Sequence, residues 1–158
     1  MDIEVLWVSF CVGGEHYCHP VNTIREILRY QVPTPVPGAP EHVSGILNVR
    51  GQVVTILSGR SLFALDEGKE DEHWRIITFE TAGELHGVTV DSVNEIIRFK
   101  QSQIFNNEQS TSGVESHLIK GTVKHGNELL VALDLTSPLQ PPKAIDKEKE
   151  KEKTTQLG

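Results

Sequence analysis

The chain is poor in cysteine and in long hydrophobic runs. Cys11 and Cys18 are the two cysteines among 158 residues, too few for a disulfide framework. The longest apolar run, Leu129–Leu133, is far shorter than the ~18 residues expected of a membrane span. The first residues, 1–4, include two acids, whereas a secretory signal needs basic residues followed by an apolar stretch. We therefore expect a cytoplasmic protein with no membrane insertion.

Basic residues are outnumbered by acidic ones. The chain has 15 Lys and Arg against 22 Asp and Glu, a net charge of −7. Residues 1–142 carry 10 bases against 18 acids, and the remaining bases lie in a charge-alternating tail over 143–158. Nucleic-acid affinity rests largely on Lys and Arg that neutralise phosphates. We therefore expect no nucleic-acid partner, and we expect a disordered tail because it has almost no apolar residues.

Motifs for catalysis are missing from the sequence. There is no Gly-rich phosphate loop after a strand and no nucleophile elbow, and the Asp and His residues are scattered along the chain. The sequence therefore predicts a protein that is not an enzyme and needs no cofactor.

One cluster, His16-Tyr17-Cys18-His19, has residue types that bind zinc, with Cys11 upstream and His42 downstream. If this stretch is a strand, His16 and Cys18 share one face and His19 points to the other. The side chains then do not converge on one centre, so we expect no metal. A small β-barrel that binds a ligand or metal through this cluster is the alternative interpretation.

Alternating apolar and polar residues predict strands separated by glycine turns. Residues 3–12 form the first strand, and Gly13-Gly14 predicts a hairpin because both positions tolerate positive φ. After Pro20, the apolar spacing over 21–28 predicts a brief helix. Four prolines between residues 31 and 40 exclude a helix and predict an ordered linker. Further elements predicted in this way are an apolar segment over 45–51 that ends in a glycine turn, and strands over 52–57, 74–80 and 85–90.

The sequence contains an internal duplication. A shift of 69 sets residues 14–30 against 83–99 with six identities over 17 positions, and a shift of 76 sets 52–57 against 128–133. Related halves this small bury little core alone, so they should pack on each other. We expect one domain over 1–142 with one lobe at about 14–66 and another at about 74–135. The strand over 3–12 is a candidate for sharing between the lobes.

Several motifs together resemble a known family. The segment over 45–51 is the most specific of them, and the second half of the chain supplies related motifs in the same order. The motifs are Val8-Ser9-Phe10, Gly14-Glu15, Glu26-Ile27, Val36–Pro40, Gly45–Gly51, Gly87-Val88, Val90–Val93, Glu95-Ile96, Ile119–Gly121 and Leu129–Leu135. They resemble the CheW-like adaptors of bacterial chemosensory arrays and the homologous regulatory domain of their histidine kinase.

The resemblance implies an all-β fold of two five-stranded SH3-like barrels packed together, with short helical connections. It also implies a scaffold without catalysis, located in receptor arrays at the inner membrane. Its partners would be the regulatory domain of a chemotaxis histidine kinase and the cytoplasmic tip of a chemoreceptor.

The resemblance also implies which residues contact these partners. They are Ile24, Glu26, Ile27, Gly45, Asn48, Val49, Arg50, Gly51, Val88, Val90 and Gly121. From the residues alone, Arg50 is either a solvated turn residue or an interface anchor, because an apolar segment that ends in an exposed Arg suits both. The first copy departs from the family in reading Ser58-Gly59 where the second keeps Asp134-Leu135.

Overall fold

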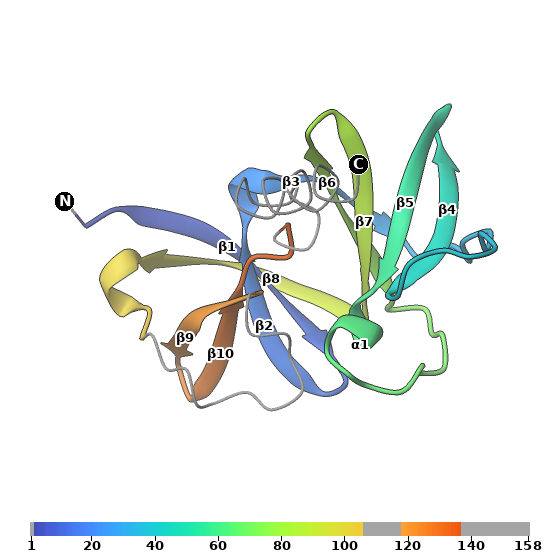
Figure 1. Ribbon diagram of the computed structural model, residues 1–158. Coiled ribbons are helices and arrows are strands. Elements are labelled where there is room, and N and C mark those ends of the chain that lie inside the picture. Colours follow the sequence, from blue (N-terminus) through green and yellow to red (C-terminus); the bar gives the residue numbers. More distant parts are fainter. Residues whose placement is uncertain (1, 106–117, 137–158) are drawn as a thin grey trace, which may run out of the picture.

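The computed structural model describes residues 2–105 and 118–136 as two five-stranded sheets (Figure 1). The first sheet has the strand order β8-β1-β2-β10-β9, and the second has the order β3-β6-β7-β5-β4. Their strands are β1 (Glu4–Val12), β2 (Glu15–Pro20), β3 (Ile24–Arg29), β4 (Val43–Val49), β5 (Gln52–Ser58), β6 (Arg75–Thr81), β7 (Glu84–Val90), β8 (Ser92–Lys100), β9 (Ile119–His125) and β10 (Glu128–Leu133). The predicted all-β fold with two five-stranded units is confirmed.

The helical connections are short. They are the helix α1 (Gly59–Leu62) and the 3₁₀ turns η1 (Val21–Thr23) and η2 (Gln101–Gln103). No helix within the described ranges is both long and apolar enough to cross a bilayer. The predicted charged tail over 143–158 lies outside the described residues.

The two sheets exchange strands between the halves of the duplication. The first sheet takes β1 and β2 from the first half and β8, β9 and β10 from the second, and the second sheet has the reverse composition. The predicted lobes at 14–66 and 74–135 are therefore wrong. The chain crosses to the other sheet after β2, through η1, and after β7, at Asp91, instead of continuing in the same sheet.

Equivalent side chains make the same contacts in both halves, which supports the duplication. Ser9 Oγ accepts from the Glu95 amide (3.1 Å) and donates to the Glu95 carbonyl (3.2 Å). Sixty-nine residues later, Thr78 Oγ1 accepts from the Glu26 amide (3.0 Å) and donates to the Glu26 carbonyl (2.8 Å). Both contacts lie where the strand register shifts. A hydroxyl thus replaces backbone partners that the bulge removes.

The apolar core has a central part and one smaller part within each sheet. Phe10 and Tyr17 of the first sheet pack with Phe79 of the second and with Phe63, which follows α1. The smaller cores centre on Trp7 in the first sheet and on Ile76 in the second. Because the central core takes residues from both sheets, neither sheet buries its inner face without the other.

Most predicted turns are confirmed, but the helix predicted over 21–28 is wrong. Gly13-Gly14 joins β1 to β2, and Ala82-Gly83 joins β6 to β7. Only Val21–Thr23 is helical, and β3 follows with alternate residues facing inward. The apolar side chain of Ile27 points outward and is 40% exposed. It gave the sequence a helical spacing that the backbone does not follow.

His19 is a fully buried histidine at the boundary between the two sheets. Its Nδ1 accepts from the Leu135 amide (3.0 Å), and its Nε2 lies 2.7 Å from Thr23 Oγ1. The ring meets Phe79 edge-on at 4.9 Å. Burial lowers the pKa of His19 to about 4, because a charged imidazole would lose its hydration there.

We predict that His19 makes the fold sensitive to acid. In the unfolded chain His19 has an ordinary pKa of 6.5 and binds a proton below that pH. In the folded chain its pKa is about 4, so it stays neutral until pH falls to that value. The stability from neutral His19 is therefore complete above pH 6.5 and is lost as pH falls toward 4, by about 3 kcal/mol for this shift. Urea unfolding between pH 7 and 4 measures it. His19→Gln should be less stable at pH 7 and should show a shallower pH dependence, and parallel curves for both proteins would contradict the prediction.

Candidate partner-binding surface

Two predicted site residues, Glu26 and Arg50, form an ion pair on the second sheet. Glu26 lies on β3, and Arg50 lies at the turn between β4 and β5. Arg50 Nη2 donates to Glu26 Oε1, while the two side chains stay 68% and 31% exposed. Because β3 and β4 are the two edges of this sheet, the pair connects its open edges at the surface.

The β4–β5 turn presents Arg50 to solvent. Val49 pairs with Gln52, so Arg50 and Gly51 are the two turn residues, with φ of 51° and 84°. Positive φ at both positions defines a type I′ turn. Asn48 Oδ1 accepts from the Gly51 amide (2.9 Å) and fixes the turn, while Val49 packs on the core of the second sheet. Three of the predicted site residues therefore shape the turn, and the turn projects the Arg50 side chain into solvent.

Further exposed polar and apolar side chains lie on the same sheet as this ion pair. Arg25 pairs with Glu80 (2.6 Å) and reaches Gln52 (3.5 Å). Ile27 on β3 and Val53 on β5 are 40% and 61% exposed. We call Arg25, Glu26, Ile27, Arg50, Gln52, Val53 and Glu80 the β3–β5 surface. Ile24, also predicted, is half-buried and packs on the central core.

Four predicted contact residues are buried and pack within the fold instead of lining its exposed surface. Val88 and Val90 belong to the central core, with 0% and 1% exposure. A Cβ on Gly45 would lie 2.2 Å from the Thr34 carbonyl oxygen, and one on Gly121 would lie 2.5 Å from that of Phe105. These glycines let Thr34 and Phe105 pair with the neighbouring strands. Their role is close backbone packing.

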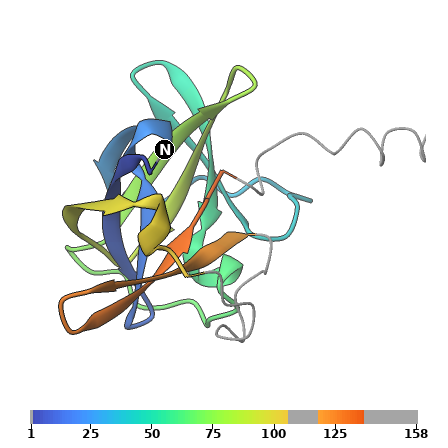
Figure 2. The ribbon, with the colours of Figure 1, turned by 90° about the vertical axis from the view of Figure 1, so that its left-hand side faces the viewer.

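The first sheet carries an equivalent surface that the sequence reasoning missed. His125 Nε2 lies 3.2 Å from Glu95 Oε1, and Ile96 and Leu129 are each 63% exposed. Glu95 and Ile96 are the counterparts of Glu26 and Ile27 under the shift of 69, which was the available signal. We call Glu95, Ile96, His125 and Leu129 the β8–β10 surface. The β9–β10 and β4–β5 turns point to opposite ends of the molecule (Figure 2).

The departure at Ser58-Gly59 is accommodated locally. Ser58 Oγ accepts from the Ser61 amide (3.1 Å) and caps α1, as Asp134 Oδ1 accepts from the Thr136 amide (3.0 Å) in the second half. Gly59 lies where a Cβ would be 2.1 Å from the Thr89 carbonyl oxygen. The hydroxyl thus replaces the carboxylate, and the glycine permits the close approach.

The alternative metal cluster is dispersed in the structure. Cys11 Sγ contacts His16 Nδ1 at 3.2 Å, whereas Cys18 lies in the core of the first sheet and His19 between the sheets. Burial raises the pKa of the Cys18 thiol to about 12. Among the residues that the structure describes, no group of three or more His, Cys, Asp or Glu is arranged to hold a metal ion.

These features describe a two-lobed β scaffold with an exposed polar and apolar surface at each end. The family model of the CheW-like domain matches residues 6–141, so the chain belongs to the CheW-like family. It is similar to the chemotaxis protein CheW of Bacillus subtilis, with 30% identity over 135 residues that cover 84% of this chain and 85% of that protein. For CheW of Helicobacter pylori the identity is 31% over 131 residues, covering 82% and 79%.

A solved structure supports the fold. The scaffolding protein TtCheW from Thermoanaerobacter tengcongensis matches with a TM-score of 0.76 at 23% identity, over 84% of this chain and 90% of that one.

We predict that Gly45 stabilises the fold. Gly45→Ala should lower the free energy of unfolding by about 2 kcal/mol or more, because the new methyl collides with fixed backbone at positive φ. Gly83→Ala is the control, since that glycine also has positive φ but nothing within 4 Å, and it should cost only about 1 kcal/mol. Equal losses in urea unfolding would show that contact with Thr34 is unimportant.

Arg50, in contrast, should contribute little to stability. We predict that Arg50→Ala changes the free energy of unfolding by no more than about 0.5 kcal/mol, because exposed ion pairs are weak. Thermal melting of the variant at low and high salt tests this. A fall in melting temperature above ~5 °C, which corresponds to roughly 1 kcal/mol or more, would make Arg50 a structural residue.

Proposed function

We propose that this protein is a chemotaxis coupling adaptor that binds a sensor histidine kinase through its regulatory domain and a chemoreceptor through its cytoplasmic tip. It acts by binding, without catalysis, in receptor arrays at the inner membrane. Family membership over residues 6–141 supports the adaptor role. We choose the β3–β5 surface as a binding site because of the Arg50–Glu26 ion pair, whose arginine lies on a turn fixed by Asn48 at one end of the molecule.

Arg50 is suited to partner binding because the fold does not need it. Its exposed ion pair adds little to stability, while Asn48 and Gly51 hold the turn in the one shape that projects its side chain. The guanidinium has five donors, and one pairing with Glu26 leaves most of them for a partner's carboxylate or carbonyls. An arginine that is already positioned loses little conformational entropy on binding, so more of its contact energy contributes to affinity.

Exposed apolar side chains on the same sheet supply the other requirement of an interface. Ile27 and Val53 are exposed on the same sheet as Arg50. Protein interfaces combine an apolar centre with a polar rim, and a few anchors, often Arg, account for most of the affinity. The β3–β5 surface has both components, and its outward charges add partner selection through complementarity.

The β8–β10 surface gives the molecule a second end for binding. An adaptor must hold two proteins at once, and two surfaces at opposite ends of one rigid body allow this without overlap (Figure 2). The two ends differ in chemistry, because Glu26 faces an arginine and Glu95 faces a histidine. We assign the two ends to different partners on this basis.

We predict that Arg50 determines binding at the β3–β5 surface. Loss of a desolvated Arg contact costs ~2 kcal/mol, so Arg50→Ala should weaken binding to the kinase regulatory domain or to a receptor fragment roughly thirtyfold. Arg50→Glu should weaken it further through repulsion of the partner's carboxylate. Titration calorimetry with both purified partners measures these affinities. His125→Ala is the control for the partner that binds at the β3–β5 surface, because His125 lies at the other end.

A double variant with exchanged charges tests whether Arg50 contacts the partner or only pairs with Glu26. Glu26→Arg with Arg50→Glu rebuilds an ion pair in the opposite direction, so the local pairing survives while the exposed charges are reversed. We expect binding to stay lost in this double variant. Full recovery of affinity, or unaltered binding of both partners by Arg50→Ala with a lower melting temperature, would show that Arg50 acts only within the fold.

A further inference from the structure

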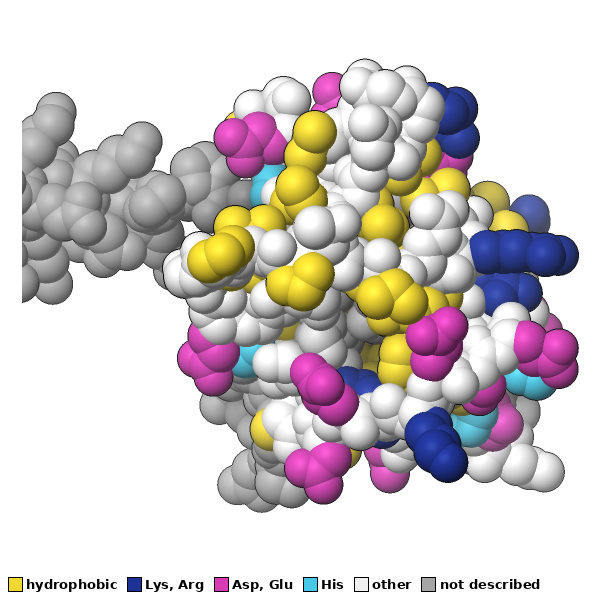
Figure 3. Space-filling model, turned by 90° about the vertical axis from the view of Figure 1, so that its right-hand side faces the viewer, with side chains coloured by type: hydrophobic (Ala, Val, Ile, Leu, Met, Phe, Trp, Pro, Cys, Tyr) yellow, Lys and Arg dark blue, Asp and Glu magenta, His cyan; other side chains and the backbone are white. Residues whose placement is uncertain are grey.

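A cavity of about 310 Å³ lies away from the β3–β5 surface, between the proline linker and the loop that follows α1. Its lining includes Tyr30 from the end of β3, Pro33 from the linker and Trp74 from the end of the loop. Figure 3 shows apolar side chains around a hollow on this face, with acidic side chains beside it. Its volume is at the lower end of the ~300–1,000 Å³ range of ligand pockets.

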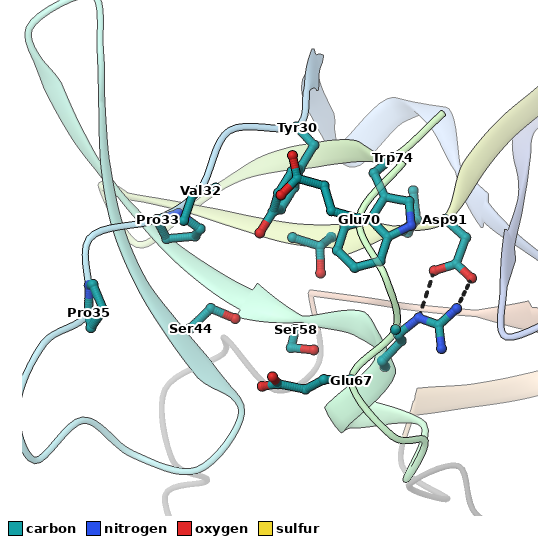
Figure 4. A pocket seen from close by; sticks show the side chains of 14 residues that line it. Tyr30, Val32, Pro33, Pro35, Ser44, Ser58, Glu67, Glu70, Trp74 and Asp91 are labelled. Atoms are coloured by element: carbon teal, nitrogen blue, oxygen red, sulfur yellow. Dashed lines mark hydrogen bonds and ion pairs between the residues drawn. The ribbon is translucent and has the colours of Figure 1, made fainter. Parts of the chain in front are cut away.

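Two aromatic rings form one wall of the cavity. The rings of Tyr30 and Trp74 meet edge to face, with centroids 5.0 Å apart, and the Tyr30 amide donates to the Trp74 carbonyl (3.2 Å). Figure 4 shows both rings at the cavity, with Pro33 and Val32 nearby. Although both rings line the cavity, they are only half-buried. They therefore offer π surface, which attracts cations.

Two carboxylates at the cavity have no cationic partner among the described residues. Glu67 and Glu70 line it from the loop (Figure 4). Burial, followed by the charges of Glu70 and Glu67, raises the pKa of the Tyr30 hydroxyl, so both carboxylates act electrostatically on that group. The Ser44, Ser58 and Thr89 residues also line the cavity and add hydroxyl acceptors.

The cation that lines the cavity, Arg60, is already occupied. Its Nε and Nη2 donate to the two carboxylate oxygens of Asp91 at 3.1 and 2.6 Å, and its Nη1 donates to the Asp66 carbonyl (3.3 Å). The guanidinium also lies 5.9 Å from the centre of the Trp74 ring. Arg60 therefore neutralises Asp91 and fixes the wall, but it leaves the charges of Glu67 and Glu70 uncompensated.

The fold itself does not require this combination of two facing aromatic rings and two glutamates. The equivalent cavity in the other half of the duplication is lined by Val5 and Lys120, which stand where the shifts of 69 and 76 place Trp74 and Ser44. That cavity therefore has an aliphatic residue at the position of Trp74 and a cation at the position of Ser44, although Trp7 and Asp134 also line it. The two facing rings of Tyr30 and Trp74 beside two glutamates without an ion-pair partner are found, among the described residues, in one half alone.

We propose that the cavity between Tyr30, Trp74, Glu67 and Glu70 binds an organic cation, an ammonium or guanidinium group carried on an apolar body. The apolar body packs on the rings and on Pro33, and the cationic group lies between the rings and the two carboxylates. The chemistry is shared by a free amine and by a Lys or Arg side chain of a partner protein. This site is independent of the coupling role of Arg50.

The first test uses three probes of one shape and different charge. Phenethylamine, 2-phenylethanol and 3-phenylpropionate are titrated into the full chain, with the indole N–H signals of Trp74 and Trp7 followed by NMR. The amine should shift the Trp74 signal with a dissociation constant on the order of 1 mM, as expected for so small a ligand. The alcohol should bind at least about tenfold more weakly, and Trp7, 3% exposed in the first sheet, should not respond.

Variants then test the carboxylates. Glu67→Gln with Glu70→Gln should weaken amine binding at least about tenfold, since it removes the unpaired charge. Glu72→Gln, on the same loop but outside the cavity, should leave it unchanged. Equal binding of amine and alcohol, no Trp74 response to the amine at ~10 mM, or unaltered binding by the double variant would each overturn the proposal.

A second arm distinguishes the sources of the cation. A capped dipeptide amide, acetyl-Lys-Leu, is titrated beside phenethylamine. Both should bind at Trp74 with the same dependence on Glu67 and Glu70, and tighter binding of the peptide would assign the site to a partner's side chain. Tighter binding of the free amine would assign it to a small molecule.

Discussion

The structure depends on one constraint, the exchange of strands between the two halves of the chain. After β2 and again after β7 the backbone crosses to the other sheet, and a central core then joins both. Asp91, the single residue between β7 and β8, accepts from the Gly13 amide (2.9 Å) and pairs with Arg60. Asp91 thereby connects the β1–β2 turn of the first sheet to α1, which follows β5 of the second sheet. Neither barrel is complete without both halves, so the two ends of the molecule are fixed relative to each other.

Much of this fold could be predicted from the sequence, because alternation and glycine turns are local signals. Strand pairing across Gly13-Gly14 and Ala82-Gly83 followed from them directly. The partition into lobes was wrong because alternation records which face of a strand is apolar and not which sheet the strand joins. The crossing at Asp91 takes one residue, too short to leave a compositional mark. The helix predicted over 21–28 was wrong because Ile27 is apolar and yet exposed.

The candidate site was only partly predictable, because a motif mixes residues that shape a surface with residues that form it. Arg50 and Glu26 lie at separate places in the sequence, and the fold brings them together. Gly45 and Val88 belong to equally marked segments, but they serve close packing and the core. Burial separates the two roles, and a single sequence does not show burial residue by residue. The β8–β10 surface was missed although the duplication had already aligned Glu95 with Glu26.

Duplication followed by divergence explains how one small domain can offer different chemistry at related positions. The paired strands need the same hydroxyl at Ser9 and Thr78, because a bulge in either sheet leaves the same backbone groups unpaired. The exposed partners of the two glutamates are free of that requirement, and an imidazole at His125 cannot reproduce the five-donor fork of Arg50. Side chains that satisfy backbone hydrogen bonds are therefore alike in both halves, whereas exposed side chains differ between them. The two equivalent ends therefore differ in the exposed side chains that they present.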